Sequence, residues 1–110
     1  MPNVKFYIDS RNCPATRETL SGMLPDLRSL LCDSLRVTQA ACQFAVIEVA
    51  GLEDQAQINT ELSLLPSPER TPEMLSGLAR RLRDEISRAT GLGVVVRVSA
   101  LDPRTYVTLK

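Results

Sequence analysis

The sequence predicts an α+β domain in which a β-α-β unit occurs twice in tandem. Four short apolar segments have the length of strands, the first of them with period-two alternation, and two longer segments carry a helical period. The halves also align at an offset of 55 residues, where Leu20-Ser21-Gly22 recurs as Leu75-Ser76-Gly77. A β-α-β crossover requires parallel strands, so each half should give one parallel pair. We therefore expect one mixed four-stranded sheet with both helices on the same face.

The length of 110 residues predicts a single domain that can bury its own core. Its pseudo-repeats cover about 1–50 and 56–101, and a tail covers 102–110. Thirteen basic residues balance thirteen acidic ones, which argues against a nucleic-acid partner. The absence of histidine excludes His-based nucleophile activation and His metal ligation, and we expect no metal.

Cysteine usage and hydropathy predict a cytoplasmic protein with no membrane partner. The three cysteines show no CxxC spacing, which is typical of reduced thiols in a cytosolic protein. Neither a secretory leader nor an apolar run of membrane length is present in the sequence. Cys13 falls in a predicted loop and is the cysteine we would test for reactivity.

The first half predicts a strand, a helix and a strand, over 4–9, about 16–36 and 42–50. Val4, Phe6 and Ile8 alternate with polar residues, as in a strand with two unlike faces. Thr16 is a candidate N-cap for the helix. Pro25 falls inside the helix, and we expect it to kink or split the helix because proline removes a backbone hydrogen bond.

The second half predicts a strand over 58–65, a helix that ends at Gly91, a strand over 94–101 and a short final strand over 105–109. Its helix carries the clearest boundaries in the chain. Thr71 is the predicted N-cap, Pro72 takes the first helical position and Gly91 supplies the C-terminal stop.

Pro2 is the first candidate for chemistry, because it stands directly behind Met1 and before the first strand. Methionine aminopeptidases generally remove methionine before a small residue, and removal here would free a secondary amine. Such an amine begins with a pKa of about 8, which an apolar pocket or a nearby cation lowers. It could then act as a general base or attack a carbonyl compound. The alternative is a tolerated Met-Pro terminus without a chemical role.

This start, the tandem β-α-β order and the chain length resemble the tautomerase superfamily. That superfamily includes 4-oxalocrotonate tautomerase, 5-carboxymethyl-2-hydroxymuconate isomerase and macrophage migration inhibitory factor. Pro2 matches the family's catalytic amino-terminal proline. The junction Glu69-Arg70-Thr71 resembles the Arg-Ser junction of the longer members. Residues 94–98 and 102–106 resemble their fourth strand and C-terminal turn.

The resemblance implies a βαββαβ protomer that forms a homotrimer, with a site near each amino-terminal proline at a subunit boundary. It implies cofactor-free keto–enol proton transfer on a small carboxylate substrate, a 2-oxo or 2-hydroxydienoate acid. The chain also departs from the family. Members often place an Arg or Lys at the start of strand two or late in helix one. Here Gln43 occupies the first place and Arg36 is the nearest cation, while Arg11 lies one position out of register with another family arginine.

Five arginines are candidates to bind a substrate carboxylate through paired hydrogen bonds: Arg11, Arg36, Arg70, Arg97 and Arg104. Each is otherwise a solvated surface charge. Arg97 interrupts an apolar strand, so we expect it to point at something polar, either a site or a neighbouring subunit. Tyr106 could donate a hydrogen bond to a developing enolate oxygen, or it could pack at a subunit edge.

Three functions follow as hypotheses. The first is a tautomerase-like isomerase that uses Pro2 as its base. The second is a non-catalytic, oligomeric binding protein of the same fold. The third is a ferredoxin-like small-ligand regulatory domain, which has a similar order of elements but largely antiparallel strands and no special N-terminus.

Overall fold

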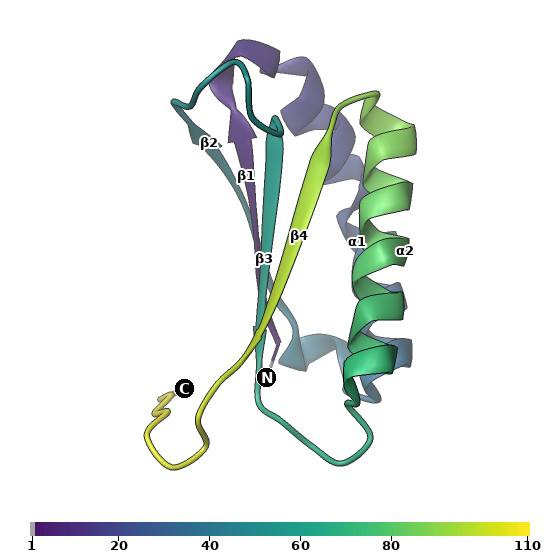
Figure 1. Ribbon diagram of the computed structural model, residues 1–110, viewed down its shortest axis with the longest axis vertical. Helices are drawn as coiled ribbons and strands as arrows, with labels where there is room; N and C mark the ends of the chain where they lie inside the picture. Colours follow the sequence, from purple (N-terminus) through teal and green to yellow (C-terminus); the bar gives the residue numbers. More distant parts are fainter. Residues whose placement is uncertain (1) are drawn as a thin grey trace.

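The computed structural model describes residues 2–110 as a four-stranded sheet with two long helices (Figure 1). The elements are β1 (Asn3–Asp9), α1 (Ala15–Leu35), β2 (Gln43–Val49), β3 (Ile58–Leu64), α2 (Pro72–Thr90) and β4 (Val94–Ala100). Short 3-10 turns lie at Ser10–Asn12 and Gln39–Ala41. The bounds of these six elements lie within one residue of the predicted ones.

The sheet order is β2-β1-β3-β4. β1 pairs in parallel with β2 and β3 in parallel with β4, while β1 and β3 meet antiparallel at the centre. The predicted mixed sheet of two parallel pairs is therefore confirmed. The ferredoxin-like alternative is wrong, because its strands would be largely antiparallel and here two of the three strand pairs are parallel.

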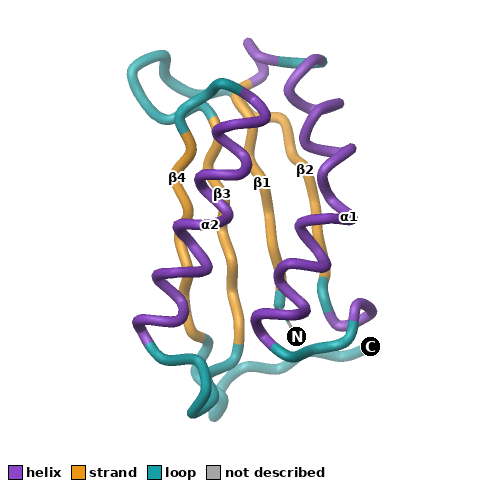
Figure 2. Tube along the Cα trace, turned by 90° about the vertical axis from the view of Figure 1, so that its right-hand side faces the viewer, coloured by secondary structure: helices purple, strands orange, loops and turns teal. Residues whose placement is uncertain are grey.

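Both helices cover one face of the sheet (Figure 2), and the core lies between these layers. Alternate strand residues and one stripe of each helix fill it, as periods of two and 3.6 require. The fully buried members include Val4, Phe6, Ile8, Leu20, Leu27, Leu31, Ile58, Leu62, Leu64, Leu82 and Ile86. The rings of Phe6 and Phe44 meet edge to face with centroids 5.9 Å apart.

The ends of α2 are capped as predicted. The backbone N–H of Met74 donates to Thr71 Oγ1 at 3.2 Å, and Pro72 occupies the first turn. Gly91 ends the helix in the left-handed region with φ of 72°, and its N–H donates to the Ser87 carbonyl at 2.8 Å. Glycine adopts this conformation without steric penalty, which explains the stop.

α1 differs from the prediction at two points. Its N-cap is Pro14, without a side-chain hydrogen bond, and Thr16 is buried inside the first turn. The helix is also continuous through Pro25. Pro25 and Ser21, four residues earlier, are both exposed. The Ser21 carbonyl that proline leaves without a partner can therefore be hydrated, and the helix need not split.

The predicted final strand over 105–109 does not form within residues 2–110. The tail instead makes a turn in which the Tyr106 N–H donates to the Asp102 carbonyl at 2.9 Å. Beyond it, Val107 is 77% exposed and Leu109 is 92% exposed. The segment has the alternation of a strand but no neighbouring strand in the described chain with which to pair.

The directions of the strands bring one end of each of the four strands and two helices to the same side of the molecule. We call this region the Pro2 end. β1 and β2 begin there, β3 and β4 end there, α1 ends there and α2 begins there, next to both termini of the chain (Figure 1). No helix in the part of the chain described by the structure is long and apolar enough to cross a membrane.

Candidate active site at the Pro2 end

Pro2 is buried, and it leads directly into β1. Its carbonyl accepts a hydrogen bond from the N–H of Gln43 at 3.0 Å, so the parallel pairing of β1 and β2 begins at the proline. This contact holds the backbone of Pro2 against the sheet. The expected removal of Met1 falls on a residue outside the described range. The position that the sequence singles out is therefore an ordered one in the fold.

A cavity of about 590 Å³ lies at this same end, between the end of α1 and the start of α2. It is lined by Ser34, Leu35, Arg36, Ser67, Glu69, Arg70 and Met74. Two of the predicted arginines, Arg36 and Arg70, thus share one cavity although they are far apart in sequence. The crossovers of the two β-α-β units bring them together.

Arg70 is tied into the backbone. Its Nη1 donates to the Leu65 carbonyl at 2.6 Å, and its Nη2 donates to the Leu35 carbonyl at 3.4 Å. The second contact satisfies an unpaired carbonyl in the last turn of α1. Arg70 therefore joins the end of α1 to the loop after β3. Sequence reasoning missed this role, because both partners are main-chain atoms that no residue pattern marks.

Arg36 follows the last residue of α1 and adopts a left-handed conformation with φ of 56°. Its backbone N–H donates to the Cys32 carbonyl and closes the helix. The side chain is exposed, and within residues 2–110 no hydrogen bond or ion pair holds its guanidinium. All guanidinium donors of Arg36 are therefore available to a ligand, whereas Arg70 keeps only part of its donors free.

Glu69 is the acidic member of the cavity. A backbone N–H and the Ser67 hydroxyl, which donates to Oε2 at 2.9 Å, lower the pKa of its carboxyl, with smaller contributions from Arg36 and Arg70. Glu69 is thus ionised at neutral pH. Two guanidinium groups against one carboxylate leave the cavity with a net positive charge, which suits an anionic ligand.

The structure does not bring Arg11 to Pro2. Arg11 follows β1 at the opposite end of the strand, roughly 20 Å from Pro2 at the usual rise per residue. There its Nη2 donates to the Gly51 carbonyl at 2.6 Å, and its Nη1 lies 3.7 Å from Asp9 Oδ2. Within one chain, Arg11 holds the loop after β2 rather than a substrate at Pro2.

Arg97 and Tyr106 do not line the cavity that contains Arg36 and Arg70. Arg97 is exposed in the middle of β4 and donates from Nε to Asn59 Oδ1 at 3.3 Å, so its polar partner in one chain is a neighbouring strand. It also stands opposite Glu61 in the sheet register. Tyr106 lies in the tail after β4, about one third exposed. Arg104, the remaining candidate, is used in the tail turn, where its Nη2 lies 3.3 Å from Asp102 Oδ2.

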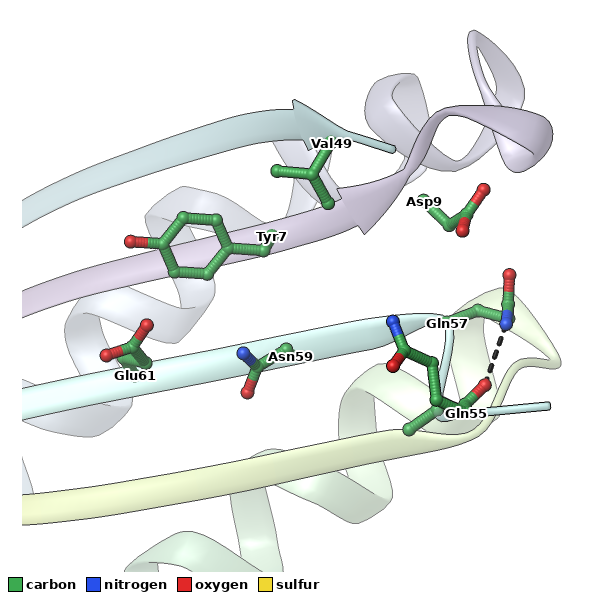
Figure 3. Close-up of a pocket in the computed structure, with 8 residues that line it drawn as sticks. Tyr7, Asp9, Val49, Gln55, Gln57, Asn59 and Glu61 are labelled. Carbon is green, nitrogen blue, oxygen red and sulfur yellow. Dashed lines mark hydrogen bonds between the residues drawn. The ribbon is translucent and has the colours of Figure 1, made fainter. Parts of the chain in front are cut away.

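A second cavity of about 250 Å³ lies on the helix-free face of the sheet, toward the far end of β1 (Figure 3). Its lining combines the apolar side chains of Val49 and Ala56 with a set of polar ones: Tyr7, Asp9, Gln55, Gln57, Asn59 and Glu61. The Gln57 side-chain amide donates to the Gln55 carbonyl at 2.7 Å and fixes the loop that forms one wall.

The acidic residues that line this second cavity disfavour a carboxylate ligand. Asp9 is almost fully buried, and its Oδ2 accepts no hydrogen bond within residues 2–110. Glu61 adds another carboxylate to the lining. Arg11, whose Nη1 lies 3.7 Å from Asp9 Oδ2, does not itself line this cavity. The two acidic residues of the lining therefore disfavour an anionic ligand, whereas two arginines line the cavity at the Pro2 end. Sequence reasoning missed Asp9, because its burial depends on the loop over 51–57 folding across the strand end.

A tandem β-α-β protomer with an ordered proline at the start of its first strand has a tautomerase-like fold, and comparison with known structures supports this. This chain is similar in structure to a wild-type fused 4-OT solved as a symmetric trimer, with a TM-score of 0.67 and 17% identity. The match covers 97% of this chain and 90% of the fused 4-OT chain. A macrophage migration inhibitory factor-like protein from Entamoeba histolytica is similar over the same share, with a TM-score of 0.68, 11% identity and 94% of its chain covered.

A protein of unknown function from Vibrio cholerae is also similar, with a TM-score of 0.76 and 17% identity, over 97% of this chain and 83% of its own. No family model matches the sequence, and no curated protein matches it. At these identities the comparisons establish the fold. The predicted likeness to 4-oxalocrotonate tautomerase and macrophage migration inhibitory factor is confirmed at that level.

Proposed function

We propose that this protein is a tautomerase-like isomerase that moves a proton in keto–enol tautomerisation of a small 2-oxo or 2-hydroxydienoate acid. The observation that carries the proposal is the position of Pro2. It is buried at the start of β1, at the same end of the fold as the cavity that contains Arg36 and Arg70. The tautomerase-like fold supports it.

The proposal gives each group at the Pro2 end a role. After loss of Met1, the Pro2 amine takes a proton from one end of the enol or enolate system and returns it at the other. Arg36 and the remaining donors of Arg70 bind the substrate carboxylate. No step requires a metal or a cofactor.

Arg11 and Arg97 enter the site only if another copy of the chain supplies them, whereas the tail that carries Tyr106 lies at the Pro2 end of its own chain (Figure 1). The fused 4-OT that shares the fold is a trimer. We propose a homotrimer here as well, with each site at a boundary between copies. Near-zero net charge is compatible with self-association, because no general repulsion opposes it.

The proposal depends on a free amine. While Met1 is attached, the Pro2 nitrogen is an amide and cannot act as a base. Intact-mass measurement of untagged protein from its native cells therefore comes first. A mass without methionine supports the isomerase. A mass with methionine favours the alternative, a non-catalytic, oligomeric binding protein.

The activity test uses the processed protein on a panel of 2-hydroxydienoates, phenylpyruvate and related 2-oxo acids. Ketonisation is followed by absorbance, and the uncatalysed rate serves as the reference. We expect acceleration for at least one acid and none for its methyl ester, because the ester lacks the carboxylate that Arg36 and Arg70 would bind. No acceleration across the whole panel would remove the support for an isomerase.

A further inference from the structure

Two cysteine thiols that are ten residues apart in sequence touch in the fold. Cys32 Sγ lies 3.3 Å from Cys42 Sγ, and both cysteines are free. Cys32 belongs to the last turn of α1, and Cys42 ends the 3-10 turn before β2. The turn at the end of α1 folds the chain back and brings the two sulfur atoms together. The sequence shows no CxxC motif, so spacing alone did not reveal the pair.

The two thiols differ in their access to solvent. Cys32 is 6% exposed, and its Sγ donates to the Thr38 carbonyl at 3.5 Å. Cys42 is half-buried and lines a surface cavity of about 280 Å³ together with Arg28 and Phe44. A small reagent can therefore reach Cys42, while Cys32 lies directly behind it. This is the arrangement of an entering thiol and a resolving thiol.

We propose that Cys32 and Cys42 form a dithiol modification site, which low-molecular-weight disulfides oxidise to an intramolecular disulfide. The Cys42 thiolate attacks one sulfur of glutathione disulfide, forms a mixed disulfide and releases one glutathione thiolate. Cys32 then attacks the Cys42 sulfur of the mixed disulfide and releases the second glutathione. Two protein thiols and one glutathione disulfide give one protein disulfide and two glutathione thiols.

The new bond would join two parts of the Pro2 end. Cys42 immediately precedes Gln43, whose N–H donates to the Pro2 carbonyl at 3.0 Å. The Cys32 carbonyl accepts from the backbone N–H groups of Arg36 and Val37. Oxidation would therefore tie the turn that carries Arg36 to the strand that pairs with Pro2. The inference stands on the thiol contact and holds whether or not the protein is an isomerase.

The surroundings of Cys42 set the conditions for the reaction. Burial and the Cys32 thiol raise the pKa of Cys42 to about 12, and Arg28 opposes the rise. Only the thiolate attacks a disulfide, so the first step is slow at neutral pH and is best followed at mildly alkaline pH.

The test incubates the full reduced protein with glutathione disulfide and measures free thiols, intact mass and non-reduced peptides. We expect two of the three thiols to disappear, the mass to fall by two hydrogen atoms, and a Cys32–Cys42 linked peptide to form. Cys32→Ser should stop at a stable glutathione adduct on Cys42. Cys13→Ser is the matched control and should still form the linked peptide. Each result supports the proposal.

Three results would overturn it: a glutathione adduct that persists on Cys42 in the unsubstituted protein, a disulfide that includes Cys13, or no loss of thiols in folded protein. Thermal unfolding gives a second readout. The short loop is closed by a bond between atoms already in contact, so the oxidised protein should have a Tm higher by roughly 5–10 °C than the reduced protein. A lower Tm would show that the thiols are not placed for bonding.

Discussion

Arg36 and Arg70 are alike in the sequence, yet the structure gives them different tasks. Arg70 donates hydrogen bonds to the carbonyls of Leu35 and Leu65, whereas the guanidinium of Arg36 has no hydrogen-bond or ion-pair partner within residues 2–110. The residue types predicted that arginines would serve the site. They could not predict which one is held by the main chain, because that depends on where α1 ends. At this scale the sequence predicts candidates, and only the fold separates them.

Arg36→Gly should weaken substrate binding without destabilising the protein. Glycine suits the left-handed conformation that Arg36 adopts, so the free energy of unfolding should stay equal or rise by up to about 1 kcal/mol. With the active acid, KM should rise about tenfold or more while kcat changes little. The control is Arg80→Ala, which removes another exposed arginine and should leave KM unchanged. Alanine replaces glycine here because Arg80 lies in the middle of a helix, where glycine would destabilise it. An unchanged KM in Arg36→Gly would remove Arg36 from the site.

Arg70→Ala should destabilise the fold, in contrast to Arg36→Gly. The carbonyls of Leu35 and Leu65 lose charged donors in a partly buried region, at a cost of about 1–3 kcal/mol. Urea denaturation followed by circular dichroism measures the change. Arg88→Ala, an exposed arginine on the same helix-rich side, should change the free energy of unfolding by less than about 0.5 kcal/mol. Equal stability of the two variants would contradict the structural role of Arg70.

The elements of this chain show which local patterns decide structure. α2 follows its sequence closely, because Thr71, Pro72 and Gly91 are each local devices that act at a helix end. Pro25 was expected to interrupt α1 and does not, since its effect depends on whether the carbonyl it leaves free meets solvent. The tail over 105–109 has a strand pattern, but a strand requires a partner that the pattern does not provide.

Thr71→Ala should destabilise α2. It removes the oxygen that accepts from the Met74 N–H at 3.2 Å and leaves that donor to water. We expect a loss of about 1 kcal/mol in the free energy of unfolding by urea titration. Thr108→Ala, in the exposed tail, removes the same hydroxyl from a residue outside any helix and should have no effect. A loss shared by both variants would mean that the cap is not the cause.

For the whole molecule, the tandem repeat predicted a mixed sheet with one parallel pair in each half, but not the strand order. Parallel pairing within each half follows from the crossovers, and the antiparallel contact of β1 with β3 joins the halves. The repeat also predicts one open sheet face. There Ile47, Tyr7, Asn59 and Val95 form a row across the four strands, and the two apolar members are half-buried. The helices leave this face open, and neither the repeat nor the element order determines whether a second chain or solvent covers it.

If the proposed trimer covers that face, Ile47→Lys should weaken it. A charge at this position would lose hydration in the interface. Light scattering after size exclusion should give three times the 12.1 kDa protomer mass for the unsubstituted protein, and a lower mass at the same concentration for Ile47→Lys. Ile47→Val keeps an apolar side chain and should remain trimeric. A monomer for the unsubstituted protein at all concentrations would rule the trimer out.

The central claim is that the Pro2 amine is the catalytic base, and one matched pair of proteins tests it most directly. Both the unsubstituted chain and Pro2→Ala present a small second residue, so both should lose Met1, and intact mass confirms this. At equal folded concentration on the active acid, Pro2→Ala should lose about 10²–10⁴ in kcat/KM, the usual contribution of a positioned general base. Pro25→Ala, an exposed proline on α1, should retain full activity. If the processed Pro2→Ala protein is as active as the unsubstituted one, Pro2 is not the base.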